Sequence, residues 1–213
     1  MPIKLGSTNF GNTYLGSTKI GEAYLGSVKM YGSQPPTPVL PAGTIRCKFS
    51  TGYTPAMGDS QTLVDASENI WDIYKSGDSW SALFYNITAL ESVIGANATG
   101  VTKMSSTFDG CSNLTTVQLF DTSSVTAMPA TFKGCSGLTS VPLFDTSSAP
   151  NMSSMFQNCT MVQSGALALY NQASNQTTPP TYHINTFYNC GRDTVTGAAE
   201  LAQIPSSWGG TGA

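Results

Sequence analysis

Five cysteines are the residues with the most evident chemical potential. Cys47 stands alone, and the other four follow a Phe-x-x-Cys spacing, at Cys111, Cys135, Cys159 and Cys190. Neighbouring members of such a series can approach closely enough for a disulfide if the units stack, whereas zinc sites usually show a close CxxC pairing, which is missing here. Because Ile87 fills the same position in the first unit, we expect small, buried, free thiols. Disulfides between successive units are the alternative.

Two carboxylates also recur, Asp121 and Asp145, each in the stretch "FDTSS". A ladder of carboxylates is one way for repeat proteins to bind calcium. Only two units carry Asp, however, and Asn97 takes the equivalent position in the preceding unit. We therefore expect these side chains to bond nearby backbone amides and shape a turn.

Catalytic motifs are missing from the sequence. His183 is the only histidine, and the chain contains no GxSxG elbow, P-loop or paired His arrangement. A glycosidase carboxylate pair is a spatial feature, so a glycan-cleaving enzyme is kept as a further alternative. The acidic residues of one segment are interpreted as turn and surface groups: Asp59, Asp65, Glu68, Asp72 and Asp78. We expect no enzyme, no cofactor and no metal.

Several aromatic residues could stack on sugars if they were exposed. They are Trp71, Trp80, Tyr85 and Tyr188. Large aromatic side chains near the ends of a repeat array more often cover its core, so the sequence leaves both roles open.

The elements that must position these groups repeat with a period of 24 residues from Trp80 onward. A period of this length, with apolar residues at fixed offsets, is typical of units that stack into one continuous core. The columns predicted to form the repeat core are Met104, Met128 and Met152; Phe108, Phe132 and Phe156; Cys111, Cys135 and Cys159; and Leu114 and Leu138. The first unit places Trp80, Phe84, Ile87 and Leu90 in these columns, and the fourth places Val162 in the last.

Within a unit, "LTTVQLFD" predicts a short strand with Leu114, Val117 and Leu119 directed inward. "MSSTFDGC" places Met104 and Phe108 four residues apart, which favours one helical turn on the return path. After the fourth unit the period breaks. "SGALALYNQASNQ", followed by "TTPPT", predicts a helix with a proline stop, and "HINTFYNC" restores the spacing with Phe187 and Cys190.

The two ends of the repeat domain are predicted to be capped. Residues 44–79 contain β-type runs such as "TIRCKF", "TLVDAS" and "NIWDIY", interpreted as a β-rich N-terminal cap with Trp71, Tyr74 and Trp80 over the open core. The tail "GAAELAQIPSSWGG" is interpreted as a C-terminal cap that closes the core with Leu201, Ile204 and Trp208.

The first 31 residues follow a different period. An apolar residue followed by Gly returns every five residues, which suits type II′ hairpin turns between very short strands. One face of such a sheet is apolar and the other collects Tyr and Lys. Strands this short need a partner to be stable. We therefore expect the apolar face to anchor the chain or to join copies, through Leu5, Phe10, Leu15, Ile20, Leu25 and Met30.

Composition narrows the class of partner. Only 10% of residues are charged and the net charge is −3, which gives no footprint for nucleic acid or an anionic membrane. The chain opens with "MPIKLGSTNF", which does not have the features of a signal peptide, and no apolar run is long enough to span a bilayer. We therefore expect either release by lysis in a phage particle or export with a signal that has been removed.

The repeat resembles the BspA-like leucine-rich repeat family over residues 44–213. The resemblance rests on the Met, Phe and Gly-Cys positions, the Leu-rich strand and "FDTSSV", in the copies starting at Met104 and Met128. The ending "AAELAQIPSSWGG" is similar to that of such chains in gut bacteria and their phages, and the "YLGS" pentads resemble N-terminal segments of phage and prophage structural proteins of gut Bacteroidetes. The resemblance implies surface display and adhesion, without naming a ligand.

The sequence thus predicts a mainly β protein with short helices (α+β), built as a leucine-rich-repeat solenoid. The expected segments are a pentad segment, a Pro-rich linker, a β-rich cap and the repeat domain with its C-terminal cap, at 1–31, 32–43, 44–79 and 80–213. We expect a phage virion protein, in a head or tail fibre or decoration, that is homo-oligomeric, with a trimer as working assumption. Its partners would be other virion proteins and a host surface protein or glycan. The alternative is a prophage-associated bacterial adhesin, extracellular or on the cell surface.

Overall fold

The structure is a computed structural model, and it describes residues 14–15, 18–19, 24–25, 28–29 and 39–212 of the 213-residue chain. The chain divides into two compact units, Met1–Val39 and Leu40–Ala213, and each is described by itself. Among its described residues, the first unit contains two antiparallel pairs, β1 (Tyr14–Leu15) with β2 (Thr18–Lys19) and β3 (Tyr24–Leu25) with β4 (Val28–Lys29).

The register of both pairs is the one that a two-residue turn requires. Leu15 lies opposite Thr18 and Leu25 lies opposite Val28, so the connections fall at 16–17 and 26–27. These are two of the five turn positions that the pentads predict. The other three turns, and the predicted division into an apolar and a Tyr/Lys face, lie outside the described residues.

The second unit begins with a mixed five-stranded sheet in the order β6-β7-β5-β8-β9. Its strands are β5 (Thr44–Phe49), β6 (Ser60–Asp65), β7 (Ile70–Tyr74), β8 (Leu90–Asn97) and β9 (Thr116–Val117). Only the β8–β9 pair is parallel. With two short helices, α1 (Ala166–Ser174) and α2 (Val195–Leu201), and the 3₁₀ turn η1 (Ser206–Trp208), the chain is mainly β with short helical elements.

Strands β5, β6 and β7 cover one end of the core of the second unit, but not with all the predicted side chains. Trp80 is fully buried and Trp71 packs partly buried against the core, whereas Tyr74 is 38% exposed. The prediction for Tyr74 is wrong because side chains alternate along β7: Ile73 takes the inward position and Tyr74 therefore faces out.

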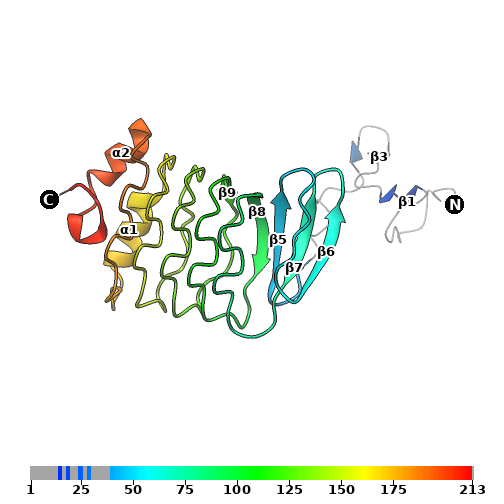
Figure 1. Cartoon of the computed structure of the whole chain (residues 1–213), viewed down its shortest axis with the longest axis horizontal. Coiled ribbons are helices and arrows are strands. Elements are labelled where there is room, and N and C mark those ends of the chain that lie inside the picture. The colour runs from blue at the N-terminus through cyan, green and yellow to red at the C-terminus, as the bar shows by residue number, and fades with distance from the viewer. Residues whose placement is uncertain (1–13, 16–17, 20–23, 26–27, 30–38, 213) are drawn as a thin grey trace. The chain divides into compact units, whose positions relative to one another are not determined.

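Beyond the sheet, successive 24-residue units lie side by side as far as α1 (Figure 1). Backbone amides join each unit to the next, because the N–H groups of Met104, Met128 and Met152 donate to carbonyl oxygens one unit further along at 2.8, 3.1 and 2.7 Å. The phenylalanine rings of neighbouring units stack at 5.1–5.2 Å between Phe84 and Phe156. This separation is close to the spacing of paired strands, so each unit adds one layer to the core.

The helical turn expected in "MSSTFDGC" is wrong. The segment is a series of turns in which alternate amides donate to the next unit, and a helix would turn those amides inward on its own carbonyls. Two positions in every unit have a positive φ, which no helix allows. The first column is Ala82, Ser106, Ala130, Ser154 and Asn185, and the second is Asn86, Gly110, Gly134, Asn158 and Asn189.

The strand expected in "LTTVQLFD" is shorter than predicted, and its inward face is different. Only Thr116 and Val117 form a strand. Leu119 is 62% exposed, and Phe120 is the buried residue at 7%. The chain leaves the ladder after Val117, so the strict alternation that predicted Leu119 to be inside no longer applies there.

The C-terminal end follows the sequence prediction in its elements. α1 begins at Ala166 and ends at Ser174, with Asn175 as its C-cap, before the two prolines. Thr194 caps α2 by accepting the Gly197 amide. Leu201, Ile204 and Trp208 are buried and close the core at this end.

Candidate functional site at the last repeat unit

The last unit differs from the others at its first core position. His183 lies four residues before Phe187, so it occupies the column filled by Trp80 and the methionines of the preceding units. Its ring stacks on Trp208 with 4.2 Å between centroids and 10° between planes. Sequence reasoning treated His183 as isolated, although the spacing to Phe187 would have assigned it to this column.

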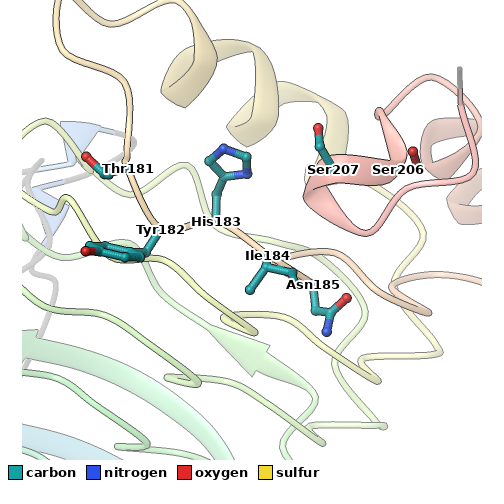
Figure 2. A pocket seen from close by; sticks show the side chains of 7 residues that line it. All are labelled: Thr181, Tyr182, His183, Ile184, Asn185, Ser206 and Ser207. Carbon is teal, nitrogen blue, oxygen red and sulfur yellow. The ribbon is translucent and has the colours of Figure 1, made fainter.

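An open groove lies beside His183, with a volume of about 450 Å³. One wall is the segment 181–185 and the other is η1 (Figure 2). The His183 ring points to one side of the segment, and the Tyr182 and Ile184 side chains point to the other (Figure 2). Tyr182 is 63% exposed and Ile184 is 66% exposed. The lining residues are Thr181, Tyr182, His183, Ile184, Asn185, Ser206 and Ser207.

No Asp, Glu, Lys or Arg lines the groove, and its polar side chains have no partner among the described residues. No side-chain hydrogen bond to another described residue is made by Thr181, Tyr182, Asn185, Ser206 or Ser207. The Nδ1 atom of His183 is buried and also has no partner among the described residues. A groove that combines exposed apolar surface with unused donors and acceptors suits the binding of an uncharged ligand better than proton transfer between charged groups.

The cysteine column consists of free, buried thiols. In three of the four, the Sγ atom lies within hydrogen-bond distance of the Phe carbonyl oxygen of the unit before it: Cys111 of Phe84 at 3.0 Å, Cys135 of Phe108 at 3.1 Å and Cys159 of Phe132 at 3.0 Å. Burial raises the pKa of the Cys111 thiol to about 12. These thiols therefore serve packing and donate weakly between units.

The recurring carboxylates shape turns. The Oδ1 atoms of Asp121 and Asp145 each accept the backbone N–H two residues later at 2.9 Å, and Asn97 accepts the Thr99 amide in the same way at 3.1 Å. The hydrogen bond from the Ser123 amide lowers the pKa of Asp121. Beside them, a second open hollow of about 350 Å³ includes the exposed Leu119 and Leu143.

The acidic residues of the N-terminal cap are each engaged elsewhere. Asp72 forms a two-armed ion pair with Arg46 at 2.7 and 2.8 Å, and Asp65 accepts the Ser67 and Glu68 amides. Three more carboxylates pair with lysines: Asp59 with Lys75, Glu68 with Lys48, and Asp78 with Lys103. Within residues 39–212, no three His, Cys, Asp or Glu side chains gather where a metal ion could be held.

The four aromatic candidates for sugar stacking separate into two pairs. Trp80 is buried and Trp71 is partly buried. Tyr85 and Tyr188 are 52% and 47% exposed. They occupy the same position in the first and last units, at opposite ends of the row.

All the predicted repeat-core residues lie at 0% exposure: Met104, Phe108, Cys111, Leu114, Met128, Phe132, Cys135, Leu138, Met152, Phe156 and Cys159. The predicted anchoring residues cannot be placed in this way. Leu15 and Leu25 belong to β1 and β3, whose side chains are outside the described part. Leu5, Phe10, Ile20 and Met30 are outside the described residues altogether.

Comparison with models of known protein families places the repeat region. A family model described as "Mycoplasma protein of unknown function, DUF285" matches residues 78–187, just over half of the chain. The match covers the repeat units and is consistent with a BspA-like protein. Searches of curated proteins and of solved structures found no match. In the described part of the chain, no helix has the length and apolarity to cross a membrane. On the extent of the family match, the chain belongs to the DUF285 family.

Proposed function

We propose that the protein is a non-enzymatic phage virion protein, part of a head or tail fibre or decoration. Residues 1–31 anchor it to the particle and join copies, and the repeat domain is displayed outward for adhesion to a host surface protein or glycan. The observation that carries the adhesive role is the groove at the last unit, which no Asp, Glu, Lys or Arg lines and in which exposed Tyr182 and Ile184 lie beside polar side chains without a described partner.

The finer fold assignment belongs to the same proposal. We infer that the units from Trp80 onward are turns of a leucine-rich-repeat solenoid of the BspA-like type. Support comes from the shared columns, the amide-to-carbonyl bonds between units and the stacked Phe108 and Phe132 rings. The phage assignment draws on the "YLGS" resemblance and on the antiparallel pairs at Tyr14 and Tyr24. The second candidate is a prophage-associated bacterial adhesin with the same binding role.

Light scattering tests the anchoring role. The full chain is compared with a version lacking residues 1–39, because residues 40–213 form a compact unit with their own core. We expect the full chain to be oligomeric and the shortened chain monomeric. Equal monomeric mass for both proteins would contradict self-assembly through the pentads.

Two further measurements distinguish a phage protein from a bacterial one and test the adhesive role. Peptides of this protein in purified virions would establish the phage carrier, whereas their presence only in the bacterial surface fraction would establish the second candidate. Binding of the fluorescently labelled full chain to intact cells of gut Bacteroidetes tests adhesion. Failure to bind any strain of a broad panel would contradict it.

A further inference from the structure

Every unit before the last directs two amides of its opening segment at the next unit. Met104 N–H donates to the Ala127 carbonyl at 2.8 Å and Ser106 N–H to Pro129 at 3.0 Å. The same pair of bonds recurs in the units that open at Trp80, Met128 and Met152, with lengths between 2.7 and 3.1 Å. In each case the acceptors are two main-chain carbonyls, two residues apart.

The last unit has the same two amides and no unit to receive them. His183 N–H and Asn185 N–H correspond to Met152 and Ser154, and neither donates to a described residue. The C-terminal cap takes only the next amide of the series, because Phe187 N–H donates to the Trp208 carbonyl at 2.9 Å. The cap thus closes the hydrophobic core and leaves part of the backbone edge open.

The open edge coincides with the groove. His183 and Asn185 both line it, between the exposed side chains of Tyr182 and Ile184 and the hydroxyls of η1 (Figure 2). An unpaired pair of backbone donors beside exposed apolar side chains is the arrangement that receives an added strand in peptide recognition.

We propose that this groove binds an extended peptide segment of a host surface protein. The segment runs parallel to residues 181–185, as the units run to one another at Asn151 and Tyr182. Two of its carbonyls, two residues apart, accept the N–H groups of His183 and Asn185. Its side chains are uncharged and partly apolar, since no Asp, Glu, Lys or Arg lines the groove and Tyr182 and Ile184 supply apolar contact. This inference rests on the proposed adhesive function and assigns its partner to the protein class.

A peptide is inferred as the ligand because of the spacing of the two free amides. In four successive units the acceptors for this pair are peptide carbonyls at a two-residue spacing, a spacing that an extended chain repeats along its whole length. The chain itself supplies a probe with this geometry. A synthetic peptide of residues 126–132, TAMPATF, contains the two carbonyls that accept from Met104 and Ser106.

Amide hydrogen exchange on the full-length protein, followed by NMR, tests the proposal. Without the probe, the amides of His183 and Asn185 exchange faster by about a hundredfold or more than those of Met152 and Ser154, which are the matched internal control. With the probe at saturation, both amides slow by about tenfold or more. Unchanged exchange at His183 and Asn185 with excess probe would mean that the edge is only solvated, and overturns the proposal.

A variant pair tests the side-chain contacts. Tyr182→Ala with Ile184→Ser installs residue types that the same positions hold elsewhere, as at Ala127 and Ser153, so the fold is expected to tolerate them. Affinity for the probe should fall about tenfold. The matched control is Tyr85→Ala, an exposed tyrosine of the first unit, which should leave the affinity unchanged. An equal loss in both proteins overturns the proposal.

The other occupants give different results. Protection of His183 and Asn185 by a neutral oligosaccharide such as chitotetraose, with none from the peptide, assigns the groove to glycan and overturns the proposal. A doubled mass in light scattering, together with protection that rises with protein concentration, assigns it to a second copy and also overturns it. The proposed function fails separately: if the protein binds cells without binding the peptide, adhesion stands and this inference falls.

Discussion

The cysteines show how one side chain can serve packing and polarity together. A free thiol is small enough for the space between two phenylalanine layers and still places a weak donor near a backbone carbonyl. Cys135 belongs to the unit of Phe132, and its Sγ reaches the carbonyl oxygen of Phe108 in the preceding unit at 3.1 Å. The sequence predicted the burial of this column from Ile87, but could not predict the hydrogen bond, because isoleucine has no donor to reveal it.

Burial should make these thiols unreactive in the folded protein. Burial raises the pKa of Cys135 and of Cys159 well above the usual value, so almost no thiolate is present at pH 8. We expect iodoacetamide at pH 8 to leave all five cysteines unlabelled in the native chain and to label them after unfolding in guanidinium chloride, as read by mass spectrometry. The control is Ser124→Cys, an exposed position, which should add one rapidly labelled site. Rapid native labelling at Cys135 would show that the column is accessible.

Residue types alone do not decide which of Leu119 and Phe120 faces the core. Both are apolar and adjacent, so the repeat pattern alone left two possible registers for the inward side. The register depends on the chain leaving the ladder after Val117, which is a tertiary property. The prediction that Tyr74 covers the core was wrong for a similar reason, since an aromatic residue near the end of a strand can face either side of it.

The recurring element is a turn series, and its left-handed positions explain its sequence. Gly110 and Gly134 share one column, where a residue without Cβ adopts positive φ at little cost. The other column holds Ala130 at φ 54° and Ser106 at φ 53°, which L side chains adopt only under strain. The pattern "GC" could have predicted the first column. The column of Ala130 and Ser106 contains no glycine, so nothing in the sequence indicated its positive φ, and the pattern predicted a helical turn instead.

A paired substitution tests these turns. Ala130→Gly should raise the free energy of unfolding by about 0.5–1 kcal/mol, because relief of strain of about 1–2 kcal/mol exceeds the added entropy of the unfolded chain. Gly134→Ala should lower it by about 1 kcal/mol, since the new Cβ has only ordinary contacts with Gly110 and the cost is that of positive φ. Urea denaturation measures both. The same sign for the two variants would contradict this account of the turns.

At the scale of the whole molecule, aromatic side chains at the C-terminal end cover the last layer of the described row of units. The stack of rings that runs from Phe84 to Phe156 continues to Phe187 at 6.2 Å and ends on Trp208 at 6.4 Å. Trp208 also stacks on His183 and meets Tyr170 edge-on at 5.4 Å. The sequence predicted this closing role from the tail. It did not predict the backbone edge left open beside it, which depends on where the cap stops.

Removal of this closing side chain should destabilise the whole domain. Trp208→Ala should lower the free energy of unfolding by about 3–5 kcal/mol, as for other large buried aromatics. Tyr85→Ala, at an exposed position of the opposite end, should change it by less than about 0.5 kcal/mol. Guanidinium denaturation followed by circular dichroism measures both. A loss below about 1 kcal/mol for Trp208→Ala would show that the row does not depend on this cap.

The uniform bonding between units has a consequence for how such genes change. The units opening at Met104 and Met128 present the same columns and the same amide pair to their neighbours. An in-frame duplication of residues 104–127 would therefore add one layer of about 4.8 Å while both ends keep their residues. Unequal recombination between the repeated DNA segments can thus lengthen or shorten the reach of the protein in fixed steps, leaving the last-unit groove unchanged.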